Sequence, residues 1–246
     1  MVGMQYWAVT DPGRVRTQNQ DACKMEQLAR NALMCVVCDG MGGAKSGNIA
    51  SALAADVFTQ TVTASYKPSM DQTQIDTLMR NAIQFTNFTV FDQSQEFVDF
   101  TGMGTTLVAV LVHGKQATVA NVGDSRVYHI NAGGIHQVTR DHSLVQMMID
   151  RGELTPGDRK NYPGKNMITR AVGTEAVVQC DLFHLDLERG DCLLACTDGL
   201  SNLVDEQEIL FEVVYHEDKQ QCCRHLLQIT LDRGAPDNVT CALVQL

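Results

Sequence analysis

The sequence predicts an α+β fold in which antiparallel sheets are layered with helices. Three observations favour it: the predicted helices come in pairs, the predicted strands follow one another in meanders, and regular βαβ alternation does not occur along the 246 residues. Because no repeat, low-complexity tract or Pro/Gly/Ser-rich linker divides the chain, we expect residues 1–246 to form one domain. With 44% hydrophobic residues, the chain can bury a full core.

The first half of the chain contains a predicted strand and two predicted helices. The run ALMCVVC (32–38) is apolar throughout, which is typical of a buried strand. Apolar residues then recur at helical spacing from Ala50 to Thr61 and again from Ile75 to Ile83. Both helices therefore need a sheet or another helix to cover one face.

The second half alternates between strand signals and helix signals. Ser143, with Gln146 three residues later, resembles a capping box that begins a short helix ending near Arg151. The polar stretch from Gly152 to about Met167 is long for a loop without structure, so we expect it to be functional or mobile. The remaining predicted segments are strands at 105–113, 116–122, 126–130, 177–185, 191–197 and 239–246, a turn at 131–134, and helices at about 205–214 and 217–231.

Composition excludes several classes of function. The formal net charge of −10 argues against nucleic acids and anionic membrane surfaces as partners, because both require a basic surface. No apolar run approaches the roughly 20 residues that span a bilayer, and the first residues lack the pattern of a signal peptide, so we expect a cytoplasmic protein. The nine cysteines are scattered, and the closest pairs, Cys35/Cys38 and Cys222/Cys223, are expected to be buried free thiols.

Aspartates adjoin the apolar runs at several points. Asp39 follows ALMCVVC, Asp124 follows ATVANVG, and Asp198 follows CLLACT. Asp237 comes just before VTCALVQL, and Asp21 begins DACKMEQLA. In an antiparallel sheet the end of one strand lies beside the start of its neighbour, so these carboxylates could converge on one edge.

A single aspartate of this kind has a simpler explanation. Asp39-Gly40 and Asp198-Gly199 are dipeptides common in turns, and either one alone would be assigned to a turn. Clustered carboxylates, however, raise one another's pKa unless cations lie between them. An all-oxygen site suits Mg²⁺ or Mn²⁺, whereas the His and Cys spacings of a zinc site and the EF-hand loop for calcium are missing.

A paired site of this kind is suited to hydrolysis at phosphorus. Arg16 is the candidate for binding the phosphate, because a guanidinium can hold two phosphate oxygens; the alternative is an ordinary surface arginine. The sequence has no cysteine with an arginine six residues later, no Gly-x-Ser-x-Gly elbow and no Gly-x-x-x-x-Gly-Lys loop. His142-Ser143 is predicted to begin a helix and not to form a nucleophile pair.

These residues match a known family. The chain resembles the metal-dependent Ser/Thr protein phosphatases of type 2C, in their compact bacterial form. The segments that carry the resemblance occur in the family's order and cover the whole chain: TDPGRVRTQNQDA (10–22), VVCDGMGG (36–43), GMGTTLVA (102–109), ANVGDSRVY (120–128), TRDHSLVQ through NMITRAVGT (139–174), CTDGLSNLV (196–204) and APDNVTCALV (235–244).

The resemblance implies a four-layer α-β-β-α sandwich, with two central antiparallel sheets flanked by helix pairs and a binuclear Mg²⁺ or Mn²⁺ centre at one edge. By this match Asp39 is the bridging ligand and Gly40 supplies a carbonyl ligand. Asp198 and Asp237 are the other direct carboxylate ligands, and Asp21 holds metal-bound water. Gly42 and Gly43 are expected to let the chain turn closely around the centre.

The match also implies a third metal site and a flap. Asp124 corresponds to the ligand that joins Asp198 at a third ion in bacterial members, and Arg16 corresponds to the phosphate-binding arginine. Residues about 143–168 correspond to the flap over the active site. Met41 occupies the position of a histidine proposed as general acid in eukaryotic relatives, so the proton donor is not assigned; our hypothesis is a water on the third metal.

The function that follows is hydrolysis of phosphoserine and phosphothreonine in proteins, with attack by a metal-activated water and no phosphoenzyme. The implied partners are phosphorylated proteins and a Ser/Thr protein kinase of the same pathway, and we expect a monomer. Two alternatives stay open: a non-catalytic phosphoprotein-binding regulator on the same fold, which predicts the loss of metal ligands, and a structural metal-binding protein, which predicts metal-dependent stability without turnover.

Overall fold

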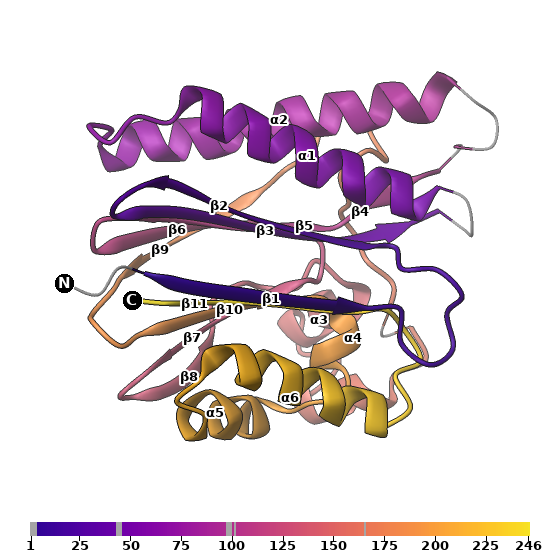
Figure 1. Cartoon of the computed structure of the whole chain (residues 1–246). Helices are drawn as coiled ribbons and strands as arrows, with labels where there is room; N and C mark the ends of the chain where they lie inside the picture. Colours follow the sequence, from indigo (N-terminus) through magenta and orange to yellow (C-terminus); the bar gives the residue numbers. More distant parts are fainter. Residues whose placement is uncertain (1–3, 43–45, 97–99, 101, 165) are drawn as a thin grey trace.

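The computed structural model of the chain has four layers (Figure 1). It describes residues 4–42, 46–96, 100, 102–164 and 166–246. Two antiparallel sheets lie face to face in the centre, one helix pair covers the outer face of the first sheet, and a second helix pair covers the outer face of the other (Figure 1). The predicted α+β sandwich is therefore confirmed.

The first sheet lies under the N-terminal helix pair. Its strands are ordered β2-β3-β5-β6-β9, and β4 pairs with the end of β3. The bounds are β2 (Asp21–Ala29), β3 (Ala32–Met41), β4 (Gly104–Thr105), β5 (Leu107–His113), β6 (Gln116–Val122) and β9 (Asp181–Asp186), with α1 (Gly47–Ser65) and α2 (Gln72–Glu96) above them. The strands β3, β5 and β6 are nearly continuous apolar runs because a sheet covers one of their faces and helices cover the other.

The second sheet lies against the C-terminal helix pair. Its strands are ordered β1-β11-β10-β7-β8. The bounds are β1 (Gln5–Asp11), β7 (Arg126–Asn131), β8 (Gly134–Gln137), β10 (Cys192–Cys196) and β11 (Val239–Gln245), with α4 (Asp198–Ser201), α5 (Glu206–Tyr215) and α6 (Lys219–Asp232). The first and last strands of the chain pair along their whole length, from Gln5 opposite Gln245 to Asp11 opposite Val239.

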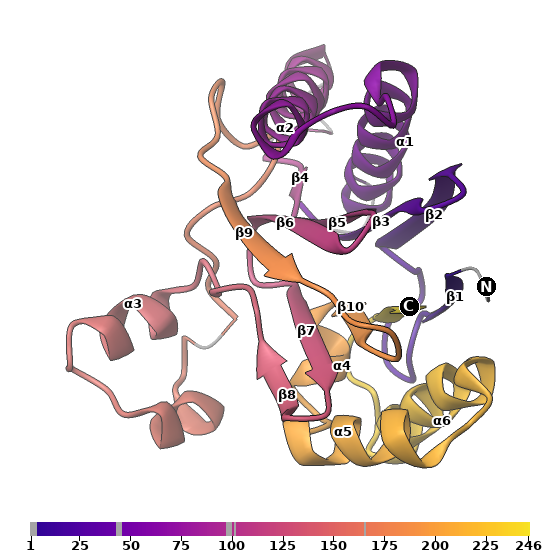
Figure 2. The ribbon, with the colours of Figure 1, turned by 90° about the vertical axis from the view of Figure 1, so that its left-hand side faces the viewer.

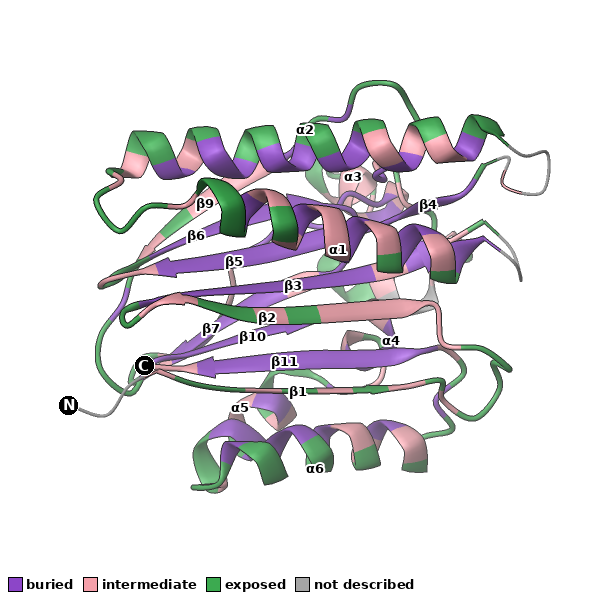
Figure 3. Cartoon of the chain, turned by 45° about the horizontal axis from the view of Figure 1, so that its top comes forward, coloured by how far each residue is buried: buried purple, intermediate pink, exposed green. Residues whose placement is uncertain are grey.

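Among the described residues, the core consists of three apolar clusters, one in each space between layers. One cluster packs α1 and α2 on the first sheet, and includes Phe58 and Met79. A second fills the space between the two sheets, and a third packs α5 and α6 on the second sheet. Figure 3 shows the result as buried central strands and helices that are buried only on the side facing a sheet.

One segment lies outside the four layers. The helix α3 (Leu144–Asp150) and the 3-10 helix η2 (Pro156–Asn161) project to one side of the sandwich, beside β8 and β9 (Figure 2). Ser143 accepts a hydrogen bond from the backbone N–H of Gln146, so the predicted cap of α3 is confirmed. The polar stretch after it was expected to be a loop; it contains η2, which Thr155 and Asp158 begin with a capping box.

One strand was not predicted, and the simpler explanation of two aspartates as turn residues is wrong. β1 was not predicted, because it is an edge strand whose mixed and largely exposed sequence gives no apolar run. Asp39-Gly40 is not a turn, since β3 continues to Met41 and Gly40 pairs with Thr105 of β4. Asp198-Gly199 is not a turn either, because Asp198 is the first residue of α4.

The predicted state of the cysteines is confirmed: all nine are free, and all except Cys23 are buried. Within the ranges that the structure describes, no helix combines the length and the apolar character needed to cross a membrane.

Candidate metal centre

A cavity of about 400 Å³ opens where the ends of the two sheets meet. Its walls include four of the predicted acidic residues, the predicted carbonyl ligand and the candidate phosphate-binding arginine. These residues are Asp39, Asp124, Asp198, Asp237, Gly40 and Arg16. Asp21 lies just behind this wall and interacts electrostatically with Asp39, Asp198 and Asp237. The predicted aspartates do converge on one cavity. They come from both sheets, however, and not from one edge of a single sheet.

Asp39 is fixed by the strand that carries it. Its backbone N–H donates to Thr106 Oγ1 at 2.9 Å, and its carbonyl accepts from the Thr106 N–H and the Thr105 hydroxyl, both at 2.9 Å. A side chain at Gly40 would meet the Gly47 carbonyl oxygen at 2.0 Å, so only glycine fits there. The next glycine, Gly42, has φ +121°, which agrees with the predicted turn, whereas Gly43 lies outside the described residues.

Asp21 lies directly opposite Asp39 in the pairing of β2 with β3. Two buried hydroxyls donate to its Oδ2, Thr197 at 2.9 Å and Thr240 at 2.7 Å. Its Oδ1 is buried without a hydrogen-bond partner among the described residues. Because like charges directly opposite each other destabilise a sheet and buried acceptors are normally satisfied, this oxygen is suited to a cation or to water held by one.

Asp198 and Asp237 come from the second sheet. Asp198 begins α4 directly after β10, and Asn202 donates to its Oδ2 at 3.0 Å from one turn later. Asp198 also lies within hydrogen-bonding reach of Asp39, so one proton would have to be shared between these carboxyls when no cation is present. Asp237 precedes β11 by two residues and accepts from the Asn238 N–H at 2.9 Å.

Asp124 lies in the short connection that carries the chain from β6 in the first sheet to β7 in the second. It lines the main cavity and a second cavity of about 140 Å³, and Asp198 also lines both. The wall of the second cavity further includes Arg126, Asp141 and Arg159. The structure therefore brings Asp124 and Asp198 together, as the sequence predicted.

The electrostatics of the cluster fit divalent cations. Burial raises the pKa of Asp21 to about 7, and the charges of Asp198 and Asp237 add to this effect. The two hydroxyl groups that donate to Asp21 lower its pKa, but they do not outweigh burial. Burial and the charge of Asp198 raise the pKa of Asp124 to about 8. The pKa values of Asp39 and Asp198 are also raised, chiefly by burial and then by their acidic neighbours. These carboxylates resist ionisation together, and Mg²⁺ or Mn²⁺ between them would remove that cost.

Arg16 lies on the loop between β1 and β2. Its Nη2 contacts Asp237 Oδ2 at 2.9 Å, and its side chain is 51% exposed at the cavity mouth. Buried Asn238 anchors the loop: its side chain donates to the carbonyls of Pro12 and Gln18 at 2.9 Å and accepts from the Gln20 N–H at 2.8 Å. The position of Arg16 is therefore set by the residue that follows Asp237.

The predicted site residues do not include this supporting layer, which consists of Asn238, Thr197, Thr240 and Thr106. A signal was present for two of them, since Asn238 and Thr240 share one face at the start of an otherwise apolar strand. Thr106 carried no such signal, because its role depends on the pairing of β3 with a distant part of the chain.

Met41 and the projecting segment form the remaining wall. Met41 lines the main cavity and an adjacent one of about 230 Å³ that includes Thr169 and Arg170. Asn166 and Ile168, from the end of the segment predicted as a flap, also line the main cavity. Lys165 of that segment lies outside the described residues.

Comparison with known proteins gives a consistent result. The family model described as protein phosphatase 2C matches residues 14–232. The chain is 34% identical to the Serine/threonine phosphatase stp of Listeria welshimeri, over 96% of this chain and 93% of that protein. It is also 34% identical to the Protein phosphatase PhpP of Streptococcus pneumoniae, over 99% and 98% of the two chains.

The chain also resembles solved structures over its whole length. The crystal structure of the serine/threonine phosphatase Stp1 from Staphylococcus aureus superposes with a TM-score of 0.92 at 37% identity, covering 100% of this chain and 95% of that one. That similarity extends through both sheets and both helix pairs.

Proposed function

The chain belongs to the protein phosphatase 2C family, and on that premise we propose that it is a metal-dependent phosphatase that hydrolyses phosphoserine and phosphothreonine in proteins. The observation that carries the proposal is the convergence of acidic side chains from both sheets on one open cavity that Arg16 also lines. A buried acidic cluster beside an arginine provides what a phosphate ester needs: cation ligands and a fixed positive group.

We assign the metal-binding roles as follows. Asp39, Asp198, Asp237 and the Gly40 carbonyl would hold two Mg²⁺ or Mn²⁺ ions, and Asp21 would hold water that belongs to the centre. Support comes from the all-oxygen donor set, the raised pKa values and the unpartnered Asp21 Oδ1. When bound, such a pair of ions lowers the pKa of a coordinated water and neutralises charge on the attacking and leaving oxygens.

Arg16 orients the substrate in this proposal. Its guanidinium is exposed at the cavity mouth and needs only to exchange part of its contact with Asp237 for phosphate oxygens. Asn238 keeps the Arg16 loop in place through its hydrogen bonds to Pro12, Gln18 and Gln20. Asn238 is therefore a positioning residue, because it acts through Arg16 and Asp237.

Met41 cannot donate a proton, since its side chain ends in a thioether. The proton for the leaving serine or threonine oxygen must therefore come from another group. We propose that Asp124 and Asp198 form a third cation site, because both carboxylates line the main cavity and the small cavity beside it.

The Asp124→Ala change tests this assignment. We expect turnover of a phosphothreonine peptide to fall by ~10- to 100-fold while Mn²⁺ binding at the two-metal centre changes little, because Asp124 is not one of its ligands. The measurement is steady-state phosphate release together with an Mn²⁺ titration of the same variant. Unchanged turnover would remove Asp124 from the mechanism.

The wider biological role follows from the proposed activity. We propose that residues 1–246 form a single catalytic domain, that residues about 143–168 act as a flap over the cavity, and that the protein works in the cytoplasm as a monomer in signal transduction. Its substrates would be proteins phosphorylated by a Ser/Thr kinase of the same pathway. The lining of the cavity by Asn166 and Ile168 supports the flap assignment.

A non-catalytic phosphoprotein-binding regulator is the competing function. It predicts a missing ligand, but each predicted ligand lies at or directly behind the cavity wall. The deciding assay is phosphate release from a phosphothreonine peptide with Mn²⁺, with and without chelator. We expect release that the chelator abolishes; binding of the peptide without any release would favour the regulator.

A further inference from the structure

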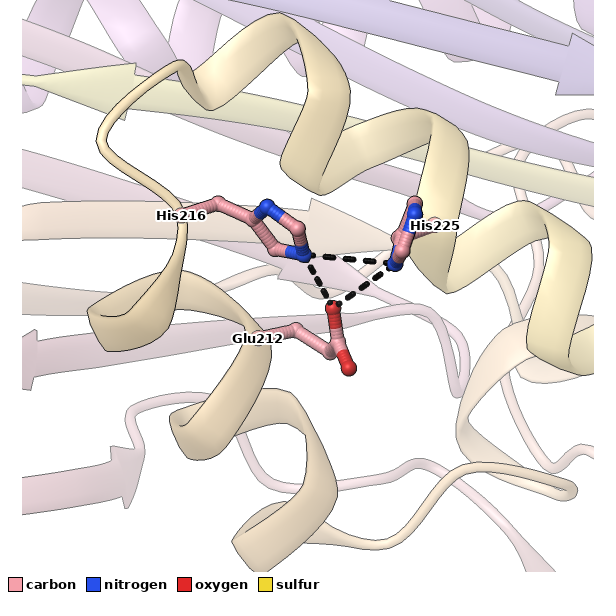
Figure 4. A group of neighbouring side chains, drawn as sticks. All are labelled: Glu212, His216 and His225. Carbon is pink, nitrogen blue, oxygen red and sulfur yellow. Dashed lines mark hydrogen bonds and ion pairs between the residues drawn. The ribbon is translucent and has the colours of Figure 1, made fainter.

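A second group of metal-binding side chains lies on the outer helix pair, and none of its members lines the acidic cavity. It consists of Glu212 on α5, His216 directly after α5, and His225 on α6, which point toward one another (Figure 4). We propose that these three residues bind a divalent transition-metal ion, with Zn²⁺ as the best match. This site is separate from the catalytic centre and does not depend on the function proposed above.

The spacing of the ligand atoms matches a tetrahedral metal site. Glu212 Oε2 lies 2.9 Å from His216 Nε2 and 3.4 Å from His225 Nδ1, and the two ring nitrogens are 3.2 Å apart. Zinc bonds to such atoms of about 2.0–2.2 Å place neighbouring ligands of a tetrahedron about 3.3–3.5 Å apart. One ion can therefore contact all three atoms after shifts of a few tenths of an ångström.

One oxygen of the carboxylate in this group is buried and accepts no directed hydrogen bond from the described residues. Glu212 is only 9% exposed, and its Oε2 has no hydrogen-bond partner among the described residues, although both imidazoles approach it. A hydrogen bond requires an N–H aimed at the oxygen, whereas a cation requires only proximity. A buried carboxylate oxygen that is near two imidazoles but accepts no hydrogen bond is costly, so a metal ion among the three side chains accounts for the arrangement better than a hydrogen-bonded trio.

The backbone around the group holds the ligands in place. Glu212 and His216 are four residues apart, and the His216 N–H donates to the Glu212 carbonyl at 3.2 Å. Lys219 then closes the end of α5, since its Nζ donates to the carbonyls of Val213 and His216 at 2.6 Å. Ligands supported by hydrogen-bonded backbone on two packed helices are suited to a defined coordination geometry.

The chemistry of the donors separates this site from the acidic cavity. Two imidazole nitrogens and one carboxylate suit Zn²⁺, whereas an all-oxygen site suits Mg²⁺ or Mn²⁺. The His225 side chain is 58% exposed, so an ion can enter from solvent and keep a position open for water or another ligand. Because the ligands come from α5 and α6, a bound ion would tie these helices together.

The test uses the whole 246-residue chain in excess Mg²⁺, which is added to fill the proposed metal centre of the acidic cavity. Zn²⁺ is titrated against a chromophoric chelator, and Co²⁺ is added separately to record its visible spectrum. We expect wild type to bind one equivalent of Zn²⁺ that His225→Ala lacks, and to give the intense Co²⁺ absorption of a four-coordinate site. Zn²⁺ should also raise the Tm of wild type but not of His225→Ala.

Matched variants control for folding and for the other centre. His136→Ala removes an exposed histidine on β8 and should bind Zn²⁺ as wild type does. Asp39→Asn alters the acidic cavity and should still bind one equivalent of Zn²⁺. The Zn²⁺ result therefore stands even if the protein proves not to be a phosphatase. His225 is exposed, and circular dichroism should show that His225→Ala is folded. Equal Zn²⁺ binding by wild type and His225→Ala, or no Zn²⁺ binding by either, would overturn the proposal.

Discussion

The aspartates of the acidic cavity combine burial with mutual repulsion. Asp21 and Asp39 face each other across two paired strands, and the Asp39 carboxyl lies within hydrogen-bonding distance of the Asp198 carboxyl. Without cations, the folded protein relieves this repulsion by keeping protons on some of the carboxyls. The unfolded chain has no such cluster, so its aspartates ionise at their ordinary pKa values. The stability of the metal-free protein must therefore depend on pH.

The sign of this dependence follows from the raised pKa values. Asp21 has a pKa of about 7 in the folded protein and Asp124 one of about 8, against an ordinary value of 3.8. Above about pH 4 the folded state holds more protons than the unfolded state, so the unfolding free energy falls as pH rises. We expect the Tm of the chelator-treated protein to decrease between about pH 5 and about pH 8, and saturating Mg²⁺ to reduce that decrease.

The control is Asp21→Asn, which cannot ionise at this position. Its metal-free Tm should fall less steeply than that of wild type through the same range. Groups away from the acidic cluster, such as His142, whose pKa is lowered by burial, contribute equally to both proteins and cancel in the comparison. The variant also removes the charge that helps to raise the pKa of Asp39, which flattens its slope further. A wild-type slope that is equal to or shallower than that of Asp21→Asn would contradict this account.

The residues that sequence could predict are those whose chemistry is unusual for their position. A charged Asp39 at the end of an apolar run is informative, because charge is rarely placed next to a buried strand without a reason. Asn238 and Thr106 were not predicted, because each acts through hydrogen bonds to residues far along the chain. The cluster of Glu212, His216 and His225 was also missed: His225 lies on the next helix, so no short spacing reveals it.

At the scale of elements, the projecting segment is attached to the sandwich through Asp141. This buried carboxylate accepts from Arg126 at 2.7 Å and contacts Arg159 of η2 as well. Arg159 also contacts Gln146 of α3, so the two helices of the segment are tied to each other and to β7. Burial alone would raise the pKa of Asp141, but the guanidinium of Arg126 and then that of Arg159 outweigh it and lower the pKa.

Two arginine variants separate the loss of attachment of this segment from a loss of stability of the whole protein. Arg126→Ala removes the more buried guanidinium, and we expect a loss of ~3 kcal/mol in unfolding free energy. Arg159→Ala leaves Asp141 paired with Arg126, so we expect a loss of only ~1 kcal/mol, or about 2–4 °C in Tm.

Hydrogen exchange provides the second measurement for these variants. In Arg159→Ala the amides of α3 and η2 should exchange much faster than in wild type, while those of β5 and β6 keep their protection. Arg151→Ala is the matched control, because Arg151 is an exposed arginine at the end of α3. Unchanged exchange in α3 and η2 of Arg159→Ala would show that Arg159 does not hold the segment.

Elements with strong apolar periodicity were predictable, and elements defined by pairing were not. The sequence located β5, β6, α1 and α2 well, because burial on two faces or on one helical stripe leaves a clear pattern. The edge strand β1 has no such pattern, and its pairing with β11 joins opposite ends of the chain. The extension of β3 through Asp39 likewise depends on β4, a two-residue strand.

The whole molecule places the acidic cavity where its two sheets meet. Asp21 and Asp39 come from the first sheet, Asp198 and Asp237 from the second, and Asp124 from the connection between them. The layered antiparallel architecture was predictable from the order of the elements and from the family resemblance. The division of the ligands between two sheets was not, because the sequence does not state which strands pair.

In the proposed mechanism these aspartates bind the metal ions that promote phosphate release. The most direct test compares wild type with Asp39→Asn in phosphate release from a phosphothreonine peptide across a range of Mn²⁺ concentrations. Asp56→Asn is the matched control, because it alters an exposed ion pair with Lys24 that contributes little to stability. We predict Mn²⁺-dependent release by wild type and Asp56→Asn, and a loss on the order of a thousandfold in Asp39→Asn. Equal rates for wild type and Asp39→Asn, or release by wild type that does not depend on Mn²⁺, would contradict the account.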